Sequence, residues 1–258
     1  MSRKKIGLAL SGGGARGFAH VGALNVLARN GIHFDMIAGT SAGSIAGAAV
    51  ASGMTPDQID TMGRNFGWLN TLRPSLSFGG LLSSVPMGKM LRRTLPVSRF
   101  EDLKIPFAAV AFDVVKGEEV ILKDSGDLVT AIRASCAVPG VFAPVPWGDK
   151  MLVDGGVTSV LPVDAVRTLG ADVVIAIDVL RCGNTFSSVP RTGIGIAIRS
   201  VMTVIGSSSA DQRGRCDHCI EPAIAHIRPD QIRRADETIR LGEEAALAAL
   251  DDIQKLLQ

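Results

Sequence analysis

The 258-residue sequence has little net charge, few aromatic residues and few cysteines. Its 27 Lys and Arg against 25 Asp and Glu leave a formal net charge of +2, whereas domains that bind nucleic acid usually concentrate basic charge. This near balance removes nucleic acid as a default partner. Disorder is also excluded as the dominant state, because 47% of the residues are hydrophobic and only 20% are charged.

The cysteine content excludes a second class of protein. Four cysteines in a chain of this length are too sparse for a secreted scaffold held by disulfides, and a reduced compartment fits them better. Cys216, His218 and Cys219 form a C-x-H-C cluster, but no second matching pair completes a tetrahedral zinc site. We therefore expect no metal centre.

Long hydrophobic runs are missing as well. The basic start of the chain precedes an apolar run over residues 6–10, which is shorter than the roughly 7–15 residues of a signal-peptide core. The uncharged residues 36–54 approach the roughly 20 residues that span a bilayer, but Gly, Ser and Ala dominate them. We expect a soluble, cytoplasmic protein.

Glycine, by contrast, is abundant, with 29 residues beside nine Phe, two Trp and no Tyr. The chain has neither a collagen-like period nor a low-complexity composition, so these glycines are expected at particular turns and loops.

Short apolar runs alternate with helical patterns in the first part of the chain. Residues 6–10 and 34–38 predict buried strands, each followed by a glycine-containing loop and a helix, the helices covering residues 18–29 and running to about Ala51. Parallel strands need helical crossovers, so this order favours an α/β fold with a largely parallel sheet. Residues 106–115 and 119–122 predict an antiparallel hairpin, which would make the sheet mixed.

The rest of the chain is less regular. A short strand is predicted over residues 151–153, a helix over 163–169 and a buried strand over 173–179. Residues 231–258 predict an amphipathic helix that docks on the core, the alternative being a dimer or membrane-surface role.

Between residues 64 and 95 the pattern breaks down. This apolar stretch is expected to be either an ordinary excursion or a mobile lid over a site. No linker separates two domains, so we expect one domain over residues 1–258.

The first candidate group is the glycine-rich sequence of residues 12–17, directly after the first strand. Its G-x-G-x-x-G pattern matches a dinucleotide-binding loop, but such a site also needs an acidic residue at the end of the second strand, and Asp35 lies at its beginning. Amides at the start of a helix can hold a developing oxyanion as well as a phosphate. Arg16 could either add charge to this loop or brace it.

The second group, residues 39–43, is a G-x-S-x-G sequence at a predicted strand-to-helix turn. A sharp turn there would expose the Ser41 hydroxyl above the sheet, and Gly39 and Gly43 would avoid clashes with a Cβ. The N–H of Ala42 would point to the same region. Ser41 is therefore a candidate nucleophile.

A serine hydroxyl needs a base, and two kinds are available. His218 or His226 would complete the chain order of an α/β-hydrolase triad with Ser41 and Asp154, although neither lies in a loop suited to that role. Asp154 ends a predicted strand before two glycines, which permit close approach. A carboxylate with a reference pKa of about 3.9 would need burial or a direct hydrogen bond to Ser41 to act as the base.

These groups, in this order and spacing, resemble the signature sequences of bacterial patatin-like phospholipases. Residues 133–145 and 161–164 resemble that family too, and the similarity runs from about Lys5 to Val179. The resemblance implies a three-layer α/β/α fold with a mixed, mainly parallel central sheet. It also implies fatty-acyl ester substrates, usually phospholipids, lysophospholipids or simpler esters, and no metal or organic cofactor.

The resemblance further implies roles for individual residues. Ser41 would be the nucleophile and Asp154 the base of a dyad that needs no histidine. The predicted oxyanion hole consists of the amides of Gly12, Gly13, Gly14 and Ala42. The predicted supporting residues are Arg16, Gly17, Gly39, Gly43, Gly155 and Gly156. Relatives often carry Asn just after the Asp-Gly-Gly sequence, whereas this chain has Thr158-Ser159-Val160.

The sequence thus predicts a serine acyl hydrolase that meets its lipid substrate through at most transient contact with a membrane surface, and it predicts no particular oligomeric state. The alternative is a non-catalytic regulator or scaffold that keeps the fold, because a fold does not guarantee activity. A nucleotide-binding protein is a third reading, which titration with NAD or ATP would test.

Overall fold

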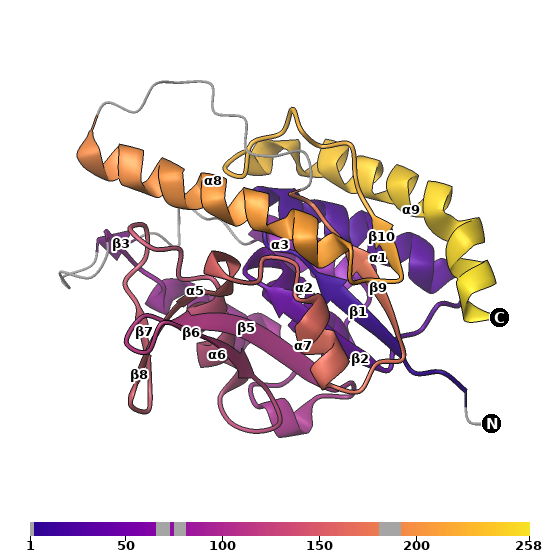
Figure 1. Ribbon diagram of the computed structural model, residues 1–258, viewed down its shortest axis with the longest axis horizontal. Helices are drawn as coiled ribbons and strands as arrows, with labels where there is room; N and C mark the ends of the chain where they lie inside the picture. Colours follow the sequence, from indigo (N-terminus) through magenta and orange to yellow (C-terminus); the bar gives the residue numbers. More distant parts are fainter. Residues whose placement is uncertain (1–2, 66–72, 75–80, 181–191) are drawn as a thin grey trace.

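The computed structural model describes residues 3–65, 73–74, 81–180 and 192–258 (Figure 1). Its strands are β1 (Ile6–Leu10), β2 (Met36–Thr40), β3 (Arg73–Pro74), β4 (Leu82–Ser83), β5 (Phe107–Asp113), β6 (Glu118–Leu122), β7 (Val145–Trp147), β8 (Lys150–Asp154), β9 (Val173–Ile177) and β10 (His218–Ile220). The main sheet has the order β10-β9-β1-β2-β5-β8-β7, with β6 also paired to β5, while β3 and β4 form a separate hairpin.

The main sheet is parallel on one side and antiparallel on the other. Strands β10, β9, β1, β2 and β5 are all parallel to their neighbours in this order, whereas β5 pairs antiparallel with both β6 and β8. The mixed, mainly parallel sheet and the hairpin after residue 106 are therefore confirmed. Carboxyl ends of parallel strands meet at one edge, which brings the loops after β1 and β2 together.

Helices cover both faces of the sheet, which gives the three layers that the sequence predicts (Figure 1). They are α1 (Phe18–Arg29), α2 (Ala42–Ala51), α3 (Pro56–Asn65), α5 (Val85–Thr94), α6 (Leu128–Ser135), α7 (Val163–Thr168), α8 (Gly193–Arg213) and α9 (Ala235–Leu257), with short 3₁₀ turns at Gly14–Gly17, Phe100–Asp102, Gly155–Val157 and Ile232–Arg234. Alternate strand residues supply the two cores: Leu8 and Leu10 pack on the side of α1 and α2, and Ala9 packs on the side of α7.

Helix α9 packs closely against α1 because glycines lie where the two helices meet. A Cβ on Gly22 would lie 2.0 Å from the Ile239 carbonyl oxygen, and a Cβ on Gly242 would lie 2.2 Å from the Ala19 carbonyl oxygen. No side chain fits at either position without moving a backbone. The helix predicted over residues 231–258 is present, but it begins at Ala235, after a 3₁₀ turn.

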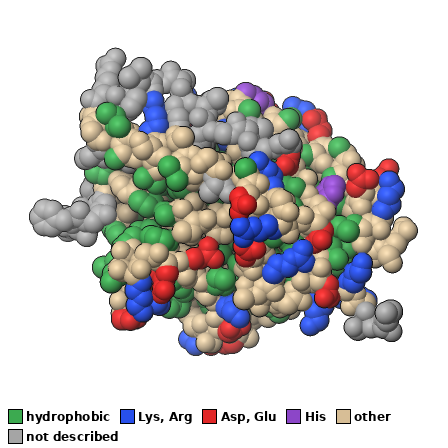
Figure 2. All heavy atoms as spheres, viewed as in Figure 1, with side chains coloured by type: hydrophobic (Ala, Val, Ile, Leu, Met, Phe, Trp, Pro, Cys, Tyr) green, Lys and Arg blue, Asp and Glu red, His purple; other side chains and the backbone are tan. Residues whose placement is uncertain are grey.

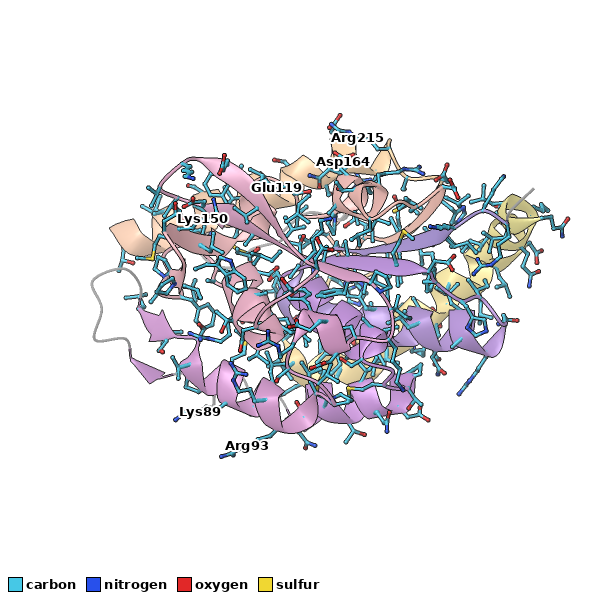
Figure 3. All side chains as sticks on the ribbon, turned by 90° about the horizontal axis from the view of Figure 1, so that it is seen from below. Lys89, Arg93, Glu119, Lys150, Asp164 and Arg215 are labelled. Carbon is cyan, nitrogen blue, oxygen red and sulfur yellow. The ribbon has the colours of Figure 1, made fainter. Side chains whose placement is uncertain are left out.

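The region of residues 64–95 differs in part from its prediction. Residues 66–72 and 75–80, which include much of the predicted lid, lie outside the described residues. Val85–Thr94, however, is a regular helix, with Met87 and Leu91 buried. Met90 also packs on the core, so the inner face of this helix carries apolar side chains at helical spacing, while Lys89 and Arg93 point away from the protein (Figure 3).

Helix α8 is the largest element that the sequence pattern does not predict. Its C-terminal part packs on the protein through Ile205, while Ile196 and Val204 are exposed. Hydrophobic side chains gather beside its N-terminal half on the left of Figure 2. Among the described residues, no helix is both long and apolar enough to cross a membrane.

Candidate active site

The register of the sheet brings Ser41 and Asp154 together from distant parts of the chain. Thr40, the last residue of β2, pairs with Val110 of β5, and Asp154, the last residue of β8, pairs with the next β5 residue, Ala111. Strand β6 pairs with the opposite edge of β5, so β2 and β8 share one edge. Ser41 follows Thr40 directly, so the carboxyl ends of β2 and β8 meet along one edge of β5 and bring Ser41 and Asp154 side by side. Gly155 makes this possible, because a Cβ on it would lie 2.3 Å from the Val110 carbonyl oxygen.

Ser41 lies in the sharp turn that its sequence predicts. Its φ of 51° and ψ of −122° are unusual for a residue with a side chain, and such strain costs on the order of 1–3 kcal/mol. A Cβ on Gly39 would lie 2.3 Å from the Gly43 carbonyl oxygen, and one on Gly43 would lie 2.2 Å from the Leu10 carbonyl oxygen. Both glycines are therefore required for the turn to cross the end of β1.

Ser135 holds this turn from the other side. The Ser41 N–H donates a hydrogen bond of 2.9 Å to the Ser135 Oγ, and Ser135 is fully buried at the end of α6. The sequence interpretation does not assign Ser135 to the site. The only signal for it lies in the position of Ser135 within residues 133–145, which carry part of the family resemblance.

Cys136 is a second nucleophile type in this region, and it is also missing from the predicted site. Its thiol lies 3.8 Å from the Ser44 Oγ and interacts with the Ser41 side chain. Burial, followed by the negative charge of Asp154, raises the pKa of the Cys136 thiol well above its ordinary value. The thiol is therefore protonated at neutral pH, which makes it a poor nucleophile beside Ser41.

The Asp154 carboxyl group is only 2% exposed. Burial raises its pKa from 3.8 to about 6, and this rise is opposed by a hydrogen bond from the Gly156 N–H, 2.8 Å from Oδ1, and by an interaction with the Ser41 hydroxyl. The carboxylate therefore satisfies both conditions for a base: it is buried, and it faces the serine hydroxyl. At neutral pH it is mostly ionised and close to the pKa range of a general base.

The glycine-rich loop supplies fewer free amides than predicted. The Gly12 N–H donates to the Val160 carbonyl oxygen at 2.9 Å, so it is engaged within the fold. The N–H groups of Gly13, Gly14 and Ala42 have no hydrogen-bond acceptor among the described residues. A Cβ on Gly17 would lie 2.9 Å from the Ala42 Cβ, so this glycine lets the loop approach the start of α2.

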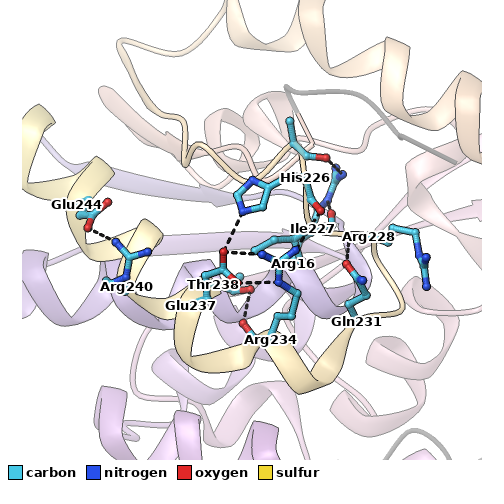
Figure 4. Close-up of polar contacts among 11 residues, drawn as sticks. Arg16, His226, Ile227, Arg228, Gln231, Arg234, Glu237, Thr238, Arg240 and Glu244 are labelled. Carbon is cyan, nitrogen blue, oxygen red and sulfur yellow. Dashed lines mark hydrogen bonds and ion pairs between the residues drawn. The ribbon is translucent and has the colours of Figure 1, made fainter. Parts of the chain in front are cut away.

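Arg16 braces the loop, which decides between the two roles left open by the sequence. Its side chain is fully buried, and its Nε donates to the Ile227 carbonyl oxygen at 2.6 Å, while a terminal nitrogen reaches the Ala225 carbonyl oxygen at 3.3 Å (Figure 4). The Ala15 N–H also bonds to the Pro229 carbonyl oxygen at 2.7 Å. The segment before α9 thus fixes the shape of the loop.

No histidine of the described residues pairs with Ser41. His226 Nε2 lies 2.9 Å from a carboxylate oxygen of Glu237 (Figure 4), and His218 lies on β10, with β9 and β1 between it and β2. His20 is buried with its Nε2 2.9 Å from the Ser11 carbonyl oxygen, and burial lowers its pKa to about 4. Within the described ranges, no hydrogen bond joins a histidine to Ser41, so the geometry gives the triad no support.

The nucleotide and zinc readings have no geometric support either. Asp35 lies before β2, where its carboxylate accepts from Arg3 and, at 2.8 Å, from the Ile6 N–H. Cys216 and Cys219 lie beside each other, but the described part of the chain has no group of three or more His, Cys, Asp or Glu side chains that could hold a metal ion.

Comparison with known proteins gives three findings. The family model described as "Patatin-like phospholipase" matches residues 8–167. An uncharacterized NTE family protein of Mycobacterium tuberculosis is 36% identical over 179 residues, which are 68% of this chain and 49% of the relative, so the chain spans about half the length of that relative. Patatin-like phospholipase domain-containing protein 6 of Mus musculus is 34% identical over 182 residues, which are 67% of this chain and 13% of that protein.

Among solved structures, VipD from Legionella pneumophila is similar to 97% of this chain, which corresponds to 67% of the VipD chain. The TM-score is 0.55 at 14% sequence identity, a likeness of fold.

Proposed function

The chain belongs to the patatin-like phospholipase family, and from this we propose that it is a serine hydrolase of fatty-acyl esters, with Ser41 as nucleophile and Asp154 as base. The substrates would be phospholipids, lysophospholipids or simpler esters. The observation that carries this proposal is the meeting of β2 and β8 on one edge of β5, which sets a buried carboxylate with a raised pKa against the hydroxyl of a strained serine.

The reaction would proceed in two halves. Ser41 Oγ attacks the ester carbonyl carbon while the Asp154 carboxylate takes the hydroxyl proton, and this proton then passes to the departing alcohol. In the second half Asp154 takes a proton from water, the hydroxide attacks the acyl-serine, and the fatty acid leaves as Ser41 regains its proton. Both halves pass through a tetrahedral oxyanion, which needs donors close to Ser41.

The amides of Gly13, Gly14 and Ala42 are the donors best placed for this oxyanion, because the Gly12 amide is bonded to Val160. One such donor is worth about 10²–10³ in rate. No cofactor is needed for these steps, since nucleophile, base and donors all belong to the chain.

We also propose that the chain works as one domain, although the family model ends at residue 167. Gln212 of α8 holds the loop after Asp154: its Oε1 accepts the Leu161 N–H at 2.8 Å, and its Nε2 donates to the Thr158 carbonyl oxygen at 2.9 Å. The segment before α9 likewise holds Arg16 of the glycine-rich loop. The C-terminal third is thereby tied to both loops of the proposed site.

The alternative function, a non-catalytic scaffold, accounts less well for these features. A strained serine and a buried carboxylate both cost stability, and such costs concentrate at functional sites. A scaffold without catalytic activity would not require a strained serine beside a buried carboxylate.

A series of p-nitrophenyl acyl esters, with phospholipid vesicles as a second substrate, tests the proposal on the wild type, Ser41→Ala and Asp154→Asn. We expect hydrolysis by the wild type and a loss of at least about a thousandfold in each variant. Hydrolysis of none of these substrates by the wild type, or full activity in Ser41→Ala, would overturn it.

A further inference from the structure

An apolar pocket opens directly beside the proposed oxyanion donors. Gly14 and Ala42 lie at its wall, and the pocket continues between α1, α2 and α3 and is partly open to solvent. It therefore borders the place where the ester carbonyl would be held and lies between three helices.

The chemistry of the pocket is uniform. Every described residue that lines it is apolar or a glycine, so no lining side chain can pair with a charge or donate a hydrogen bond. Small residues lie near the donors, and larger side chains from α1 and α3 lie deeper: Phe18, Ile59 and Met62, all of them less than 9% exposed. Such a surface gains free energy from burying hydrocarbon and offers nothing to a polar headgroup.

A second pocket lies on the other side of Val21 and provides a contrast. It is lined by the carboxylates of Asp57, Asp60, Asp236 and Glu243, with Arg64 among them. This surface suits neither a hydrocarbon chain nor an anionic headgroup. Of the two pockets, only the first is both apolar and continuous with the proposed donors.

We propose that the pocket between α1, α2 and α3 binds the acyl chain of the ester substrate and sets which chain lengths are cleaved fastest. The proposal rests on the proposed function, because it places the ester carbonyl at the amides of Gly14 and Ala42. The alcohol part of the ester would then lie on the opposite side of Ser41, outside this pocket.

The contact between α1 and α3 sets the size of the pocket. A Cβ on Gly63 would lie 2.8 Å from a ring carbon of Phe18, so the absence of a side chain at residue 63 lets α3 lie against the Phe18 ring. Ile45 of α2 also lines the pocket, one helical turn after Ser41, and it is only half-buried. A larger side chain at Ile45 can therefore narrow the pocket with less disturbance of the core than a change at Met62.

The first experiment measures kcat/KM for p-nitrophenyl acetate, butyrate, octanoate and decanoate. Each methylene that enters the pocket should raise kcat/KM about fourfold, so the octanoate-to-acetate ratio should exceed roughly a hundredfold in the wild type. Ile45→Trp should lower that ratio by at least about tenfold, and Ile45→Ala should shift the optimum to longer chains. Val50→Trp, on the same helix but outside the pocket, is the matched control and should keep the wild-type ratio.

A second experiment does not depend on catalysis. Calorimetry of sodium octanoate binding to Ser41→Ala should give saturable binding, which the added Ile45→Trp substitution weakens by at least about tenfold and the added Val50→Trp substitution leaves unchanged. The pocket proposal is overturned if both Ile45 variants keep the wild-type chain-length profile, or if octanoate binds equally well with Trp at position 45. Absence of ester hydrolysis together with Ile45-sensitive octanoate binding would instead overturn the proposed function and keep the pocket.

Discussion

Replacing Asp154 with asparagine should stabilise the folded protein at alkaline pH while it removes activity, and both effects have one cause. The carboxyl group is 2% exposed, and burial raises its pKa from 3.8 to about 6 against the opposing bonds from Gly156 and Ser41. A shift of this size means that keeping the carboxylate ionised inside the fold costs about 3 kcal/mol. A charge that the proposed reaction needs is therefore held at the expense of stability.

The sign of the pH dependence follows from the proton count. Between about pH 4 and pH 6 the folded protein keeps the Asp154 proton that the unfolded chain has already released, so the free energy of unfolding falls as the pH rises through this window. Asparagine has no proton to lose, and its Oδ1 can still accept the Gly156 N–H. We expect Asp154→Asn to be more stable than the wild type by up to about 3 kcal/mol near pH 8, with the difference vanishing below about pH 4.

Urea unfolding at several pH values measures this difference, and Asp113→Asn is a matched control. Asp113 is also buried at the end of β5, but hydrogen bonds from the Val115 and Met151 N–H groups and the nearby Lys150 ammonium outweigh burial and lower its pKa. Asp113→Asn should therefore lose stability at alkaline pH. The reasoning fails if Asp154→Asn is less stable than the wild type near pH 8, or if the difference between them is independent of pH. In the wild type, kcat/KM should rise with pH through about 6 as the base ionises.

Three further predictions concern residues around the site. Ser135→Ala removes the acceptor of the Ser41 N–H and should lower kcat at least about tenfold with little change in KM, while Ser135→Thr should restore much of it; equal loss in both variants would contradict a positioning role. His226→Ala should keep kcat/KM within about twofold of the wild type, and a loss on the order of a thousandfold would reinstate a triad. Gly242→Ala should destabilise the fold by about 2 kcal/mol or more in urea unfolding, because its Cβ would lie 2.2 Å from the Ala19 carbonyl oxygen; unchanged stability would contradict the close contact of α1 and α9.

Sequence patterns were sufficient wherever structure depends on neighbours along the chain. The strand over Ile6–Leu10 and the helix over Phe18–Arg29 agree with their predicted bounds, because buried apolar runs and helical periodicity are local signals. The turn at Ser41 was predictable for the same reason. Helix α8 was not predictable in this way, since its N-terminal half is apolar on several sides and shows no single stripe.

The same distinction holds for the site residues: those indicated by local sequence were predicted, and those determined by distant contacts were not. Ser135 and Cys136 were not assigned from sequence, because the residues around them carry only the family resemblance and do not indicate that α6 ends next to Ser41. The Gly12 amide was predicted to be free, and the distant Val160 carbonyl occupies it. Each of these differences arises from a partner far away in the chain.

By itself, the sequence determined the chemical groups available and the backbone turns that present them: a serine between two glycines after one strand, a glycine-rich loop after another, and an aspartate before Gly155. Only the tertiary structure decided which groups meet. The registers of β2 and β8 on one edge of β5 place Asp154 beside Ser41, and burial there raises the pKa of Asp154 toward that of a base. The physical reason is that a turn's geometry depends on adjacent residues, whereas burial, close backbone contacts at glycines and hydrogen-bond partners depend on where distant segments pack.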